Sequence, residues 1–307
     1  GFPESHSVSF AYLVYASSWL KRWNPAAFCA GLLNAQPMGF YSPHTLVQDA
    51  RRHGVRTRTP DVNASDWCAT IEPCDRSEGG LAVRLGLSYV RHVGDDLAKA
   101  IAAGRPYASI EDVARRTGAS SQALEALATA GAFDCFSTVT APEPRPNFGG
   151  SRQHAAGSLQ RSGVGDRRAA LWTAGAVTEA GADRLEGIVV GTRAPTLPGM
   201  EPIEEAMADL WATGVAPDGH PTTFLREQLD GFGVVTSAGL ARHEPGEKVL
   251  VAGVVTHRQR PATAGGTMFI NLEDETGLIN VVCSLGCWIH HRTVARSAPA
   301  LLVRGRL

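Results

Sequence analysis

The stretch that decides the fold is residues 1–41, GFPESHSVSFAYLVYASSWLKRWNPAAFCAGLLNAQPMGFY. Apolar residues recur in it at three- and four-residue spacing, which predicts a helix. The residues that set this spacing are Phe10, Leu13, Val14 and Leu20. Asn24 and Pro25 predict the start of a second helix, because Asn is a favoured cap and Pro is tolerated at the first helical position. We therefore expect a bent helical pair that is buried on one side.

Basic and polar residues lie at the two ends of the first predicted helix. Residues 3–6 come just before it, beside its positive N-terminal end, where backbone N–H groups can meet a phosphate. Lys21 and Arg22 lie at the junction with the second helix. This pattern makes Ser5, His6, Lys21 and Arg22 candidates for contact with a phosphate group.

The composition sets the class of the protein. The chain has 307 residues, of which 44% are hydrophobic and 19% charged, enough for two or three domains with cores of their own. The sequence has no run of 18 apolar residues, which argues against a membrane span, and no signal peptide is visible. The six cysteines are scattered, as in a reduced, cytoplasmic protein, although Cys283 and Cys287 near His290 and His291 leave a metal site open. The net charge is −1, but residues 1–60 and 249–307 are basic and residues 177–248 are acidic, so we expect the two ends of the chain to face phosphate.

Local patterns divide the chain into five parts. Residues 1–76 are helical with one short strand, and they carry a basic cluster that is either a DNA-facing edge or a solvated surface; its members are Arg51, Arg52, Arg56 and Arg58. Residues 81–136 predict a helix-hairpin-helix module, in which a glycine turn aims helix amides at a DNA phosphate, with Gly94 at that turn. Residues 137–164 are rich in Pro and Gly and predict a flexible insertion or linker. Residues 165–246 predict a helical connector, and residues 247–307 predict alternating strands.

The hairpin contains an unusual residue. His92 stands where this type of hairpin normally has glycine. Because only glycine adopts positive φ without strain, we expect His92 to be tolerated only if its backbone avoids positive φ. A helical spacer without DNA contact is the alternative function for residues 81–136.

Several runs carry a resemblance to a known family. The runs that match are residues 1–6, 15–17, 19–21, 25–28 and 32–41, then 46–55, 61–67, 131–134 and 167–176, with His220-Pro221 as a further landmark. They resemble the end of the fingers domain and the following regions of bacterial C-family DNA polymerases, and more narrowly the error-prone paralogue of the DNA polymerase III alpha subunit. Pro3-Glu4 and the run QPMGFY at 36–41 are typical of the error-prone group. We expect the chain to be a C-terminal fragment of such a polymerase.

The C-terminal strands resemble the OB-fold of the same polymerases. The runs that match are 251–256, 258–261 and 272–277. The expected fold is thus multidomain α+β: a helical fingers end, a helix-hairpin-helix module and a C-terminal antiparallel OB barrel. OB-folds bind single strands through basic and aromatic side chains on one face. The candidates are Arg258, Arg260, Phe269 and Trp288, with a barrel-core position as the alternative for Phe269.

The resemblance implies a DNA-directed DNA polymerase that acts in translesion synthesis after DNA damage. Its reaction needs paired Mg²⁺ ions held by carboxylates, and the family places these in the palm, upstream of Gly1, so we expect this fragment to position DNA without polymerising. Implied partners are primer-template DNA, the sliding clamp and an inactive Y-family-like adaptor. The run QLDGF at 228–232 weakly resembles a clamp-binding peptide, but Gly231 stands where such peptides need a large apolar residue. A non-enzymatic single-strand-binding module and a repair scaffold are the alternatives.

Overall fold

The computed structural model describes residues 4–39, 41–136, 167–177 and 191–307. Pro3 and the predicted insertion at 137–164 lie outside the described residues. The helices are α1 (Glu4–Trp23), α2 (Pro25–Asn34), α3 (Pro43–Arg52), α4 (Asp95–Ala103), α5 (Ile110–Thr117), α6 (Ser121–Thr129), α7 (Arg167–Ala176), α8 (Pro202–Thr213), α9 (Pro221–Phe224), α10 (Arg226–Gly231) and α11 (Leu285–Ser297). The strands are β1 (Thr57–Arg58), β2 (Thr70–Pro73), β3 (Leu81–Arg84), β4 (Lys248–Gln259), β5 (Met268–Glu273), β6 (Leu278–Cys283) and β7 (Ala300–Arg306).

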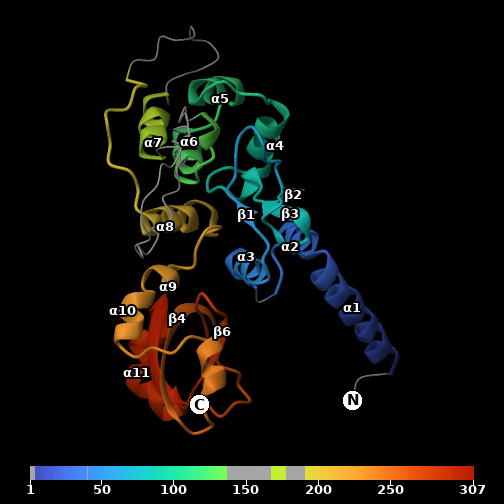
Figure 1. Ribbon diagram of the computed structural model, residues 1–307, viewed down its shortest axis with the longest axis vertical. Coiled ribbons are helices and arrows are strands. Elements are labelled where there is room, and N and C mark those ends of the chain that lie inside the picture. The colour runs from blue at the N-terminus through green and yellow to red at the C-terminus, as the bar shows by residue number, and fades with distance from the viewer. Residues whose placement is uncertain (1–3, 40, 137–166, 178–190) are drawn as a thin grey trace, which may run out of the picture.

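These elements form three bodies (Figure 1). Helices α4 to α7 make the upper body, α2, α3 and the small sheet β1–β3–β2 make the middle one, and the curled sheet with α11 makes the lower one. Helix α1 leaves the middle body and projects away from it (Figure 1). The chain is therefore an α+β arrangement of several bodies, as the sequence predicts.

The middle body is built on α2. Pro25 occupies its first position, and its inner side packs Cys29 and Leu33 against Val83 of β3 and Val47 of α3. Strand β3 pairs parallel with β1 and antiparallel with β2. Ser42 caps α3 by accepting a hydrogen bond from the Thr45 amide over 3.2 Å. This body thus fixes the position of α3, which reaches the C-terminal sheet.

The predicted burial of the first helix is wrong. Phe10, Leu13, Val14 and Leu20 of α1 are all exposed, by 43–60%. They do not bury a stripe against α2, because the 20-residue helix runs outward from the body and only its last turn meets α2 and α3. Helix α1 also begins at Glu4, so Ser5 and His6 lie in its first turn and not before it.

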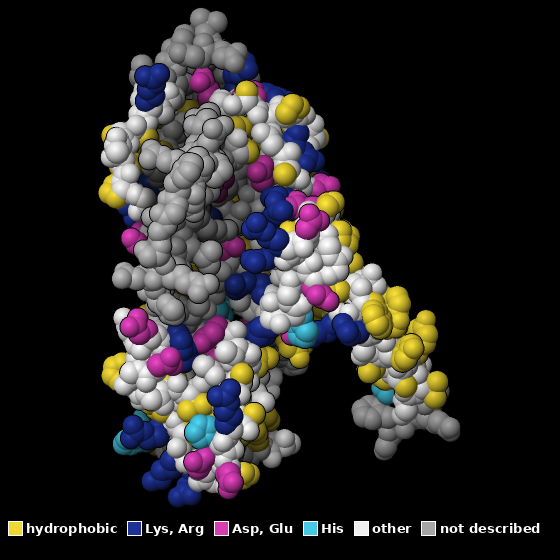
Figure 2. Space-filling model, viewed as in Figure 1, with side chains coloured by type: hydrophobic (Ala, Val, Ile, Leu, Met, Phe, Trp, Pro, Cys, Tyr) yellow, Lys and Arg dark blue, Asp and Glu magenta, His cyan; other side chains and the backbone are white. Residues whose placement is uncertain are grey.

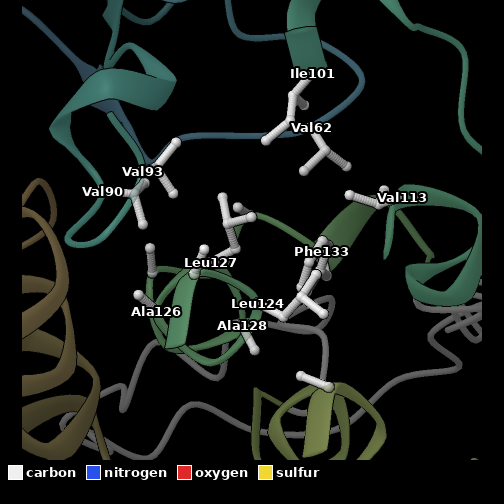
Figure 3. Close-up of a cluster of buried hydrophobic side chains, with 14 of the residues drawn as sticks. Val62, Val90, Val93, Ile101, Val113, Leu124, Ala126, Leu127, Ala128 and Phe133 are labelled. Carbon is white, nitrogen blue, oxygen red and sulfur yellow. The ribbon is translucent and has the colours of Figure 1, made fainter. Parts of the chain in front are cut away.

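The upper body has the largest described core. Figure 3 shows side chains from α4, α5 and α6 pointing toward one another around Leu124, Leu127 and Phe133. Ser109 and Ser120 cap α5 and α6 by accepting hydrogen bonds from the amides of Asp112 and Ala123. Below α6, Arg167 of α7 lies 2.7 Å from Asp209 of α8, and both side chains are buried.

The C-terminal sheet has the strand order β6–β5–β4–β7, and each neighbouring pair is antiparallel. It is curled, with a bulge in β4 between Val255 and His257, and it forms a half-barrel that fits an OB-fold. Gly253 allows β4 to approach β5 closely, since a Cβ there would lie 2.8 Å from the Glu273 carbonyl oxygen. Helix α11 covers the inner face of the sheet with Trp288 and Ala295.

Candidate nucleic-acid interface

The candidates on α1 lie at its two ends. Ser5 is in the first turn, and the ring of His6 lies 4.4 Å from that of Phe10, edge to face. Lys21 pairs with Asp49 of α3 over 2.8 Å, and the Arg22 guanidinium lies over the Trp23 ring. Lys21 therefore ties α1 to α3, and Arg22 is the more exposed cation of the two.

The basic cluster at the end of α3 is partly used by the fold. Arg51 donates to the Gln48 side chain and to the Asp218 carbonyl, and Arg52 donates to the Glu273 carboxylate. Arg58 pairs with Glu72 over 2.6 Å. Arg56 is exposed and near enough to Arg51 that its charge, after the larger effect of burial, helps to lower the pKa of Arg51. Arg56 is thus the member best placed to meet a phosphate.

Figure 2 shows Lys and Arg side chains gathered in a column over β1 and α3, next to the base of α1. Others lie around the lower end of the molecule, over the C-terminal sheet and α11 (Figure 2). These are the two ends of the chain that the charge distribution marks as basic. The two regions lie on the same side of the molecule in this view.

The hairpin before α4 differs from the expectation for His92. Its φ is +63°, so His92 takes the left-handed conformation that the sequence predicts it must avoid. The turn is formed nevertheless, because the Val93 amide bonds to the Val90 carbonyl and the Arg91 amide bonds to Ala212 of α8. Gly94 is the N-cap of α4, but the first turn of that helix carries Asp95 and Asp96, whose charges oppose a phosphate at this end.

Two of the C-terminal candidates are corrected by the structure. Trp288 is only 6% exposed, because α11 turns it into the core against the inner face of the sheet, so it cannot stack a base there. Arg258 donates from Nε to the Ala295 carbonyl over 2.7 Å and also bonds to the Ala298 carbonyl, so it caps the end of α11. The sequence pattern predicts only strands and turns in this region, whereas the structure has a helix there.

Phe269 and Arg260 remain at the surface. Phe269 is 36% exposed and points away from the core, between Val282 of β6 and Gln259 of β4 in the register. The Arg260 guanidinium lies 5.8 Å from the centre of the Trp288 ring. Phe269 is therefore an aromatic side chain on the outer face of the sheet, which is where an OB-fold takes a single strand.

The outer face holds further residues that the sequence reasoning missed. Asn271 shares it on β5, Asn280 lies opposite on β6, and Arg304 and Arg306 extend from it on β7, opposite Leu250 and Lys248. The alternation within 300–306 would have placed the two arginines on one face of the strand. Their position on the same face as Phe269, toward the other end of β4, depends on the strand order, which one strand does not reveal.

Comparison with known proteins shows which proteins the chain is similar to. The helix-hairpin-helix motif family matches residues 54–141. The error-prone DNA polymerase of Nocardia farcinica is 53% identical over 100% of this chain and 25% of its own length. Those of Mycolicibacterium paratuberculosis and Corynebacterium glutamicum are 51% and 45% identical over 100% and 99% of the chain. The chain matches the C-terminal portion of error-prone DNA polymerases. It spans about a quarter of the length of these relatives.

The described residues do not fit a metal centre. Within residues 4–39, 41–136, 167–177 and 191–307, no three His, Cys, Asp or Glu side chains lie together as possible ligands. Cys283 is buried and Cys287 exposed, without further ligands gathered around them. We therefore derive no catalytic step through Mg²⁺ in this chain. In the same part of the chain, no helix is long and apolar enough to cross a membrane.

Proposed function

We propose that this chain is the DNA-positioning, C-terminal part of a DNA-directed DNA polymerase that acts in damage-induced translesion synthesis. The similarity to error-prone DNA polymerases over nearly the whole chain supports this role. The residues for nucleotidyl transfer, including the carboxylates that hold Mg²⁺, belong to the rest of such a polymerase. We also propose that the chain is divided into domains at residues 1–76, 81–136, 165–246 and 247–307. The proposed location is cytoplasmic. The proposed protein partners are the sliding clamp and a Y-family-like adaptor.

The single observation that carries the proposal is the outer face of the curled sheet. Near one end of β4 it carries an exposed aromatic ring, Phe269, with the amide side chains of Asn271 and Asn280. Arg304 and Arg306 lie on the same face toward the other end of β4, opposite Leu250 and Lys248. OB-folds bind single strands without reading sequence by stacking bases on aromatic rings and by following the phosphates with cations along the same face. This face is thus suited to hold the template strand.

Helix α1 favours a polymerase over a free-standing single-strand-binding module. Large apolar residues surround it on all sides; those exposed by 43% or more are Val8, Phe10, Tyr12, Leu13, Val14, Tyr15, Trp19, Leu20 and Trp23. A helix that is apolar all round is typical of the interior of a larger protein. The relatives are about four times as long as this chain and can supply that surrounding.

Fluorescence anisotropy with labelled oligo-dT over a salt series tests the proposed function. We expect Phe269→Ala to weaken binding by about 1–3 kcal/mol at every salt concentration, as for loss of one stacking partner. Arg304→Ala/Arg306→Ala should weaken binding and lower the salt slope by roughly 1 to 2. Arg292→Ala is the matched control, because Arg292 is exposed on α11, which covers the opposite face. Binding that is unchanged in both outer-face variants would show that the sheet does not hold the strand.

A further inference from the structure

The acidic run Glu273-Asp274-Glu275 at the end of β5 is not explained by DNA binding. Glu273 and Asp274 are fully buried, although carboxylates are seldom buried without partners. Each of the three side chains holds a different part of the chain. Asp274 accepts hydrogen bonds from the amides of Thr276, Gly277 and Ser237 and so shapes the turn itself.

Glu273 reaches out of the sheet to α3. One carboxylate oxygen accepts a hydrogen bond from Thr45 Oγ1 over 2.9 Å, and the other accepts one from Arg52 Nη1 over 3.1 Å. The partners lie more than 200 residues away in the sequence, on the middle body. Burial raises the pKa of Glu273, and the bonds from Thr45 and Arg52 oppose that rise. The contact therefore joins two bodies through a buried, charge-assisted network.

Glu275 makes a second link, to α9 and α10. It accepts two hydrogen bonds from Arg226 of α10, at 2.6 and 2.9 Å, and one from the Thr222 hydroxyl of α9. The segment before α9 is held in turn by α3, because Gln48 donates to the Ala216 carbonyl over 3.0 Å and Arg51 donates to the Asp218 carbonyl. Glu273 therefore contacts α3 directly, and Glu275 is connected to α3 through α9 and the segment before it.

We propose that Glu273 is a positioning residue that fixes the distance between two parts of the DNA path. Phe269 and Glu273 lie on the same face of β5, four residues apart, which corresponds to about 13 Å along the strand. Arg52, which Glu273 holds, lies at the end of α3, and its charge acts on Arg51 together with that of the exposed Arg56. The network therefore keeps the outer face of the sheet, which carries Phe269, at a constant distance from the basic surface that carries Arg56. This inference rests on the proposed function in one respect, namely that both surfaces contact the same strand.

The test compares a short and a long strand on the whole chain. An oligo-dT of about 6 nucleotides fits the site of one OB-fold, whereas one of about 20 nucleotides extends beyond it. Glu273→Gln should weaken binding of the long strand by roughly tenfold, because the two surfaces no longer act at a fixed effective concentration. It should leave binding of the short strand within about twofold of the unchanged chain. An equal effect on both strands, or no effect on either, would overturn the positioning role.

A second measurement does not depend on DNA. Hydrogen exchange should speed up together in α3 and in residues 272–277 in Glu273→Gln. It should also do so in Thr45→Val, which with little change of shape removes the bond to Glu273 and the 3.1 Å contact of Thr45 Oγ1 with Ser42 Oγ. Glu247→Gln is the control, because Glu247 lies in the same body and bonds to the nearby His243 and Glu244. If the unchanged chain binds neither strand, the proposed function fails, while unchanged exchange in Glu273→Gln and Thr45→Val would overturn the positioning network itself.

Discussion

Arg258 donates from Nε to the carbonyl oxygen of Ala295 over 2.7 Å, which ties the end of β4 to the last turn of α11. The guanidinium also reaches the Ala298 carbonyl. Carbonyls at the end of a helix lack hydrogen-bond partners within the helix. A cation beside them also interacts favourably with the negative end of the helix dipole. The residue that the sequence suggested as a DNA ligand is therefore a cap.

The first prediction separates Arg258 from Arg260. Arg258→Ala should lower the free energy of unfolding of the C-terminal body by about 1–3 kcal/mol, the range for hydrogen bonds from a charged donor. Arg260→Ala should leave stability within about 0.5 kcal/mol and weaken DNA binding with a salt slope lower by about 1. Urea unfolding followed by Trp fluorescence measures stability, because Trp288 is buried in this body. If Arg258→Ala unfolds at the same urea concentration as the unchanged chain, the capping role is wrong.

The second prediction concerns His92. Its φ of +63° is a conformation that costs a residue with a Cβ about 1–2 kcal/mol. His92→Gly removes this strain but makes the unfolded chain more flexible, so we expect a net gain of about 0.5–1 kcal/mol. His92→Ala keeps the strain and serves as the control for loss of the imidazole. Circular dichroism during urea unfolding gives both values, and a glycine variant that is less stable than the alanine variant would contradict the strain.

The sequence determines some elements well and others poorly, for local reasons. The caps at Ser42, Ser109 and Ser120 and the strand Ala300–Arg306 follow from nearby residues, and the structure has them. Helix α11 is not apparent from the sequence, because Gly286 and the kink at His291 interrupt its pattern. The positions of Trp288 and Arg258 depend on that helix and could not be right without it.

The predicted burial of α1 rests on a pattern that does not identify the partner surface. Apolar spacing shows which side chains leave water, not which part of the chain covers them. Likewise, Arg51, Arg52 and Arg58 form a basic run in the sequence, but their carboxylate and carbonyl partners lie elsewhere in the chain. Long-range partners of this kind decide which members of a basic cluster remain available for phosphate.

The third prediction uses the buried pair Arg167–Asp209. Burial raises the pKa of Asp209 to about 7, against the lowering effect of Arg167 2.7 Å away. Arg167→Met leaves the carboxylate without its cation and should cost about 3–5 kcal/mol at pH 8. The loss should be smaller at pH 5, because a raised pKa lets the folded state keep a proton that the unfolded chain releases.

The double variant Arg167→Met/Asp209→Leu is the matched comparison for this pair. Replacing both charges with apolar groups should recover most of the stability, since no buried charge remains. Urea unfolding at pH 5 and pH 8 measures all three chains. A single variant with the same loss at both pH values would show that Asp209 does not titrate in this range.

The last prediction is a loss of stability in acid that originates at two histidines. The rings of His44 and His220 lie 5.6 Å apart where α3 meets the segment before α9. Burial, chiefly, lowers the pKa of His44 to about 3 and that of His220 to about 4; neighbouring Arg51 and Arg52 add to both shifts. In the unfolded chain both side chains titrate near the ordinary histidine pKa of 6.5.

The direction of this pH effect on folding stability follows from the number of protons that each state binds. Between pH 6.5 and about 4 the unfolded state holds up to two protons that the folded state excludes, so stability is full above pH 6.5 and falls as the pH is lowered. From pH 7.5 to pH 5 we expect these two groups to cost about 2–4 kcal/mol. His44→Gln/His220→Asn should lose correspondingly less over this range, because the introduced asparagine can cap α9 as His220 does through its Nδ1. His243→Gln, an exposed histidine variant, is the control, and an unchanged dependence on pH in the double variant would place the acid sensitivity elsewhere.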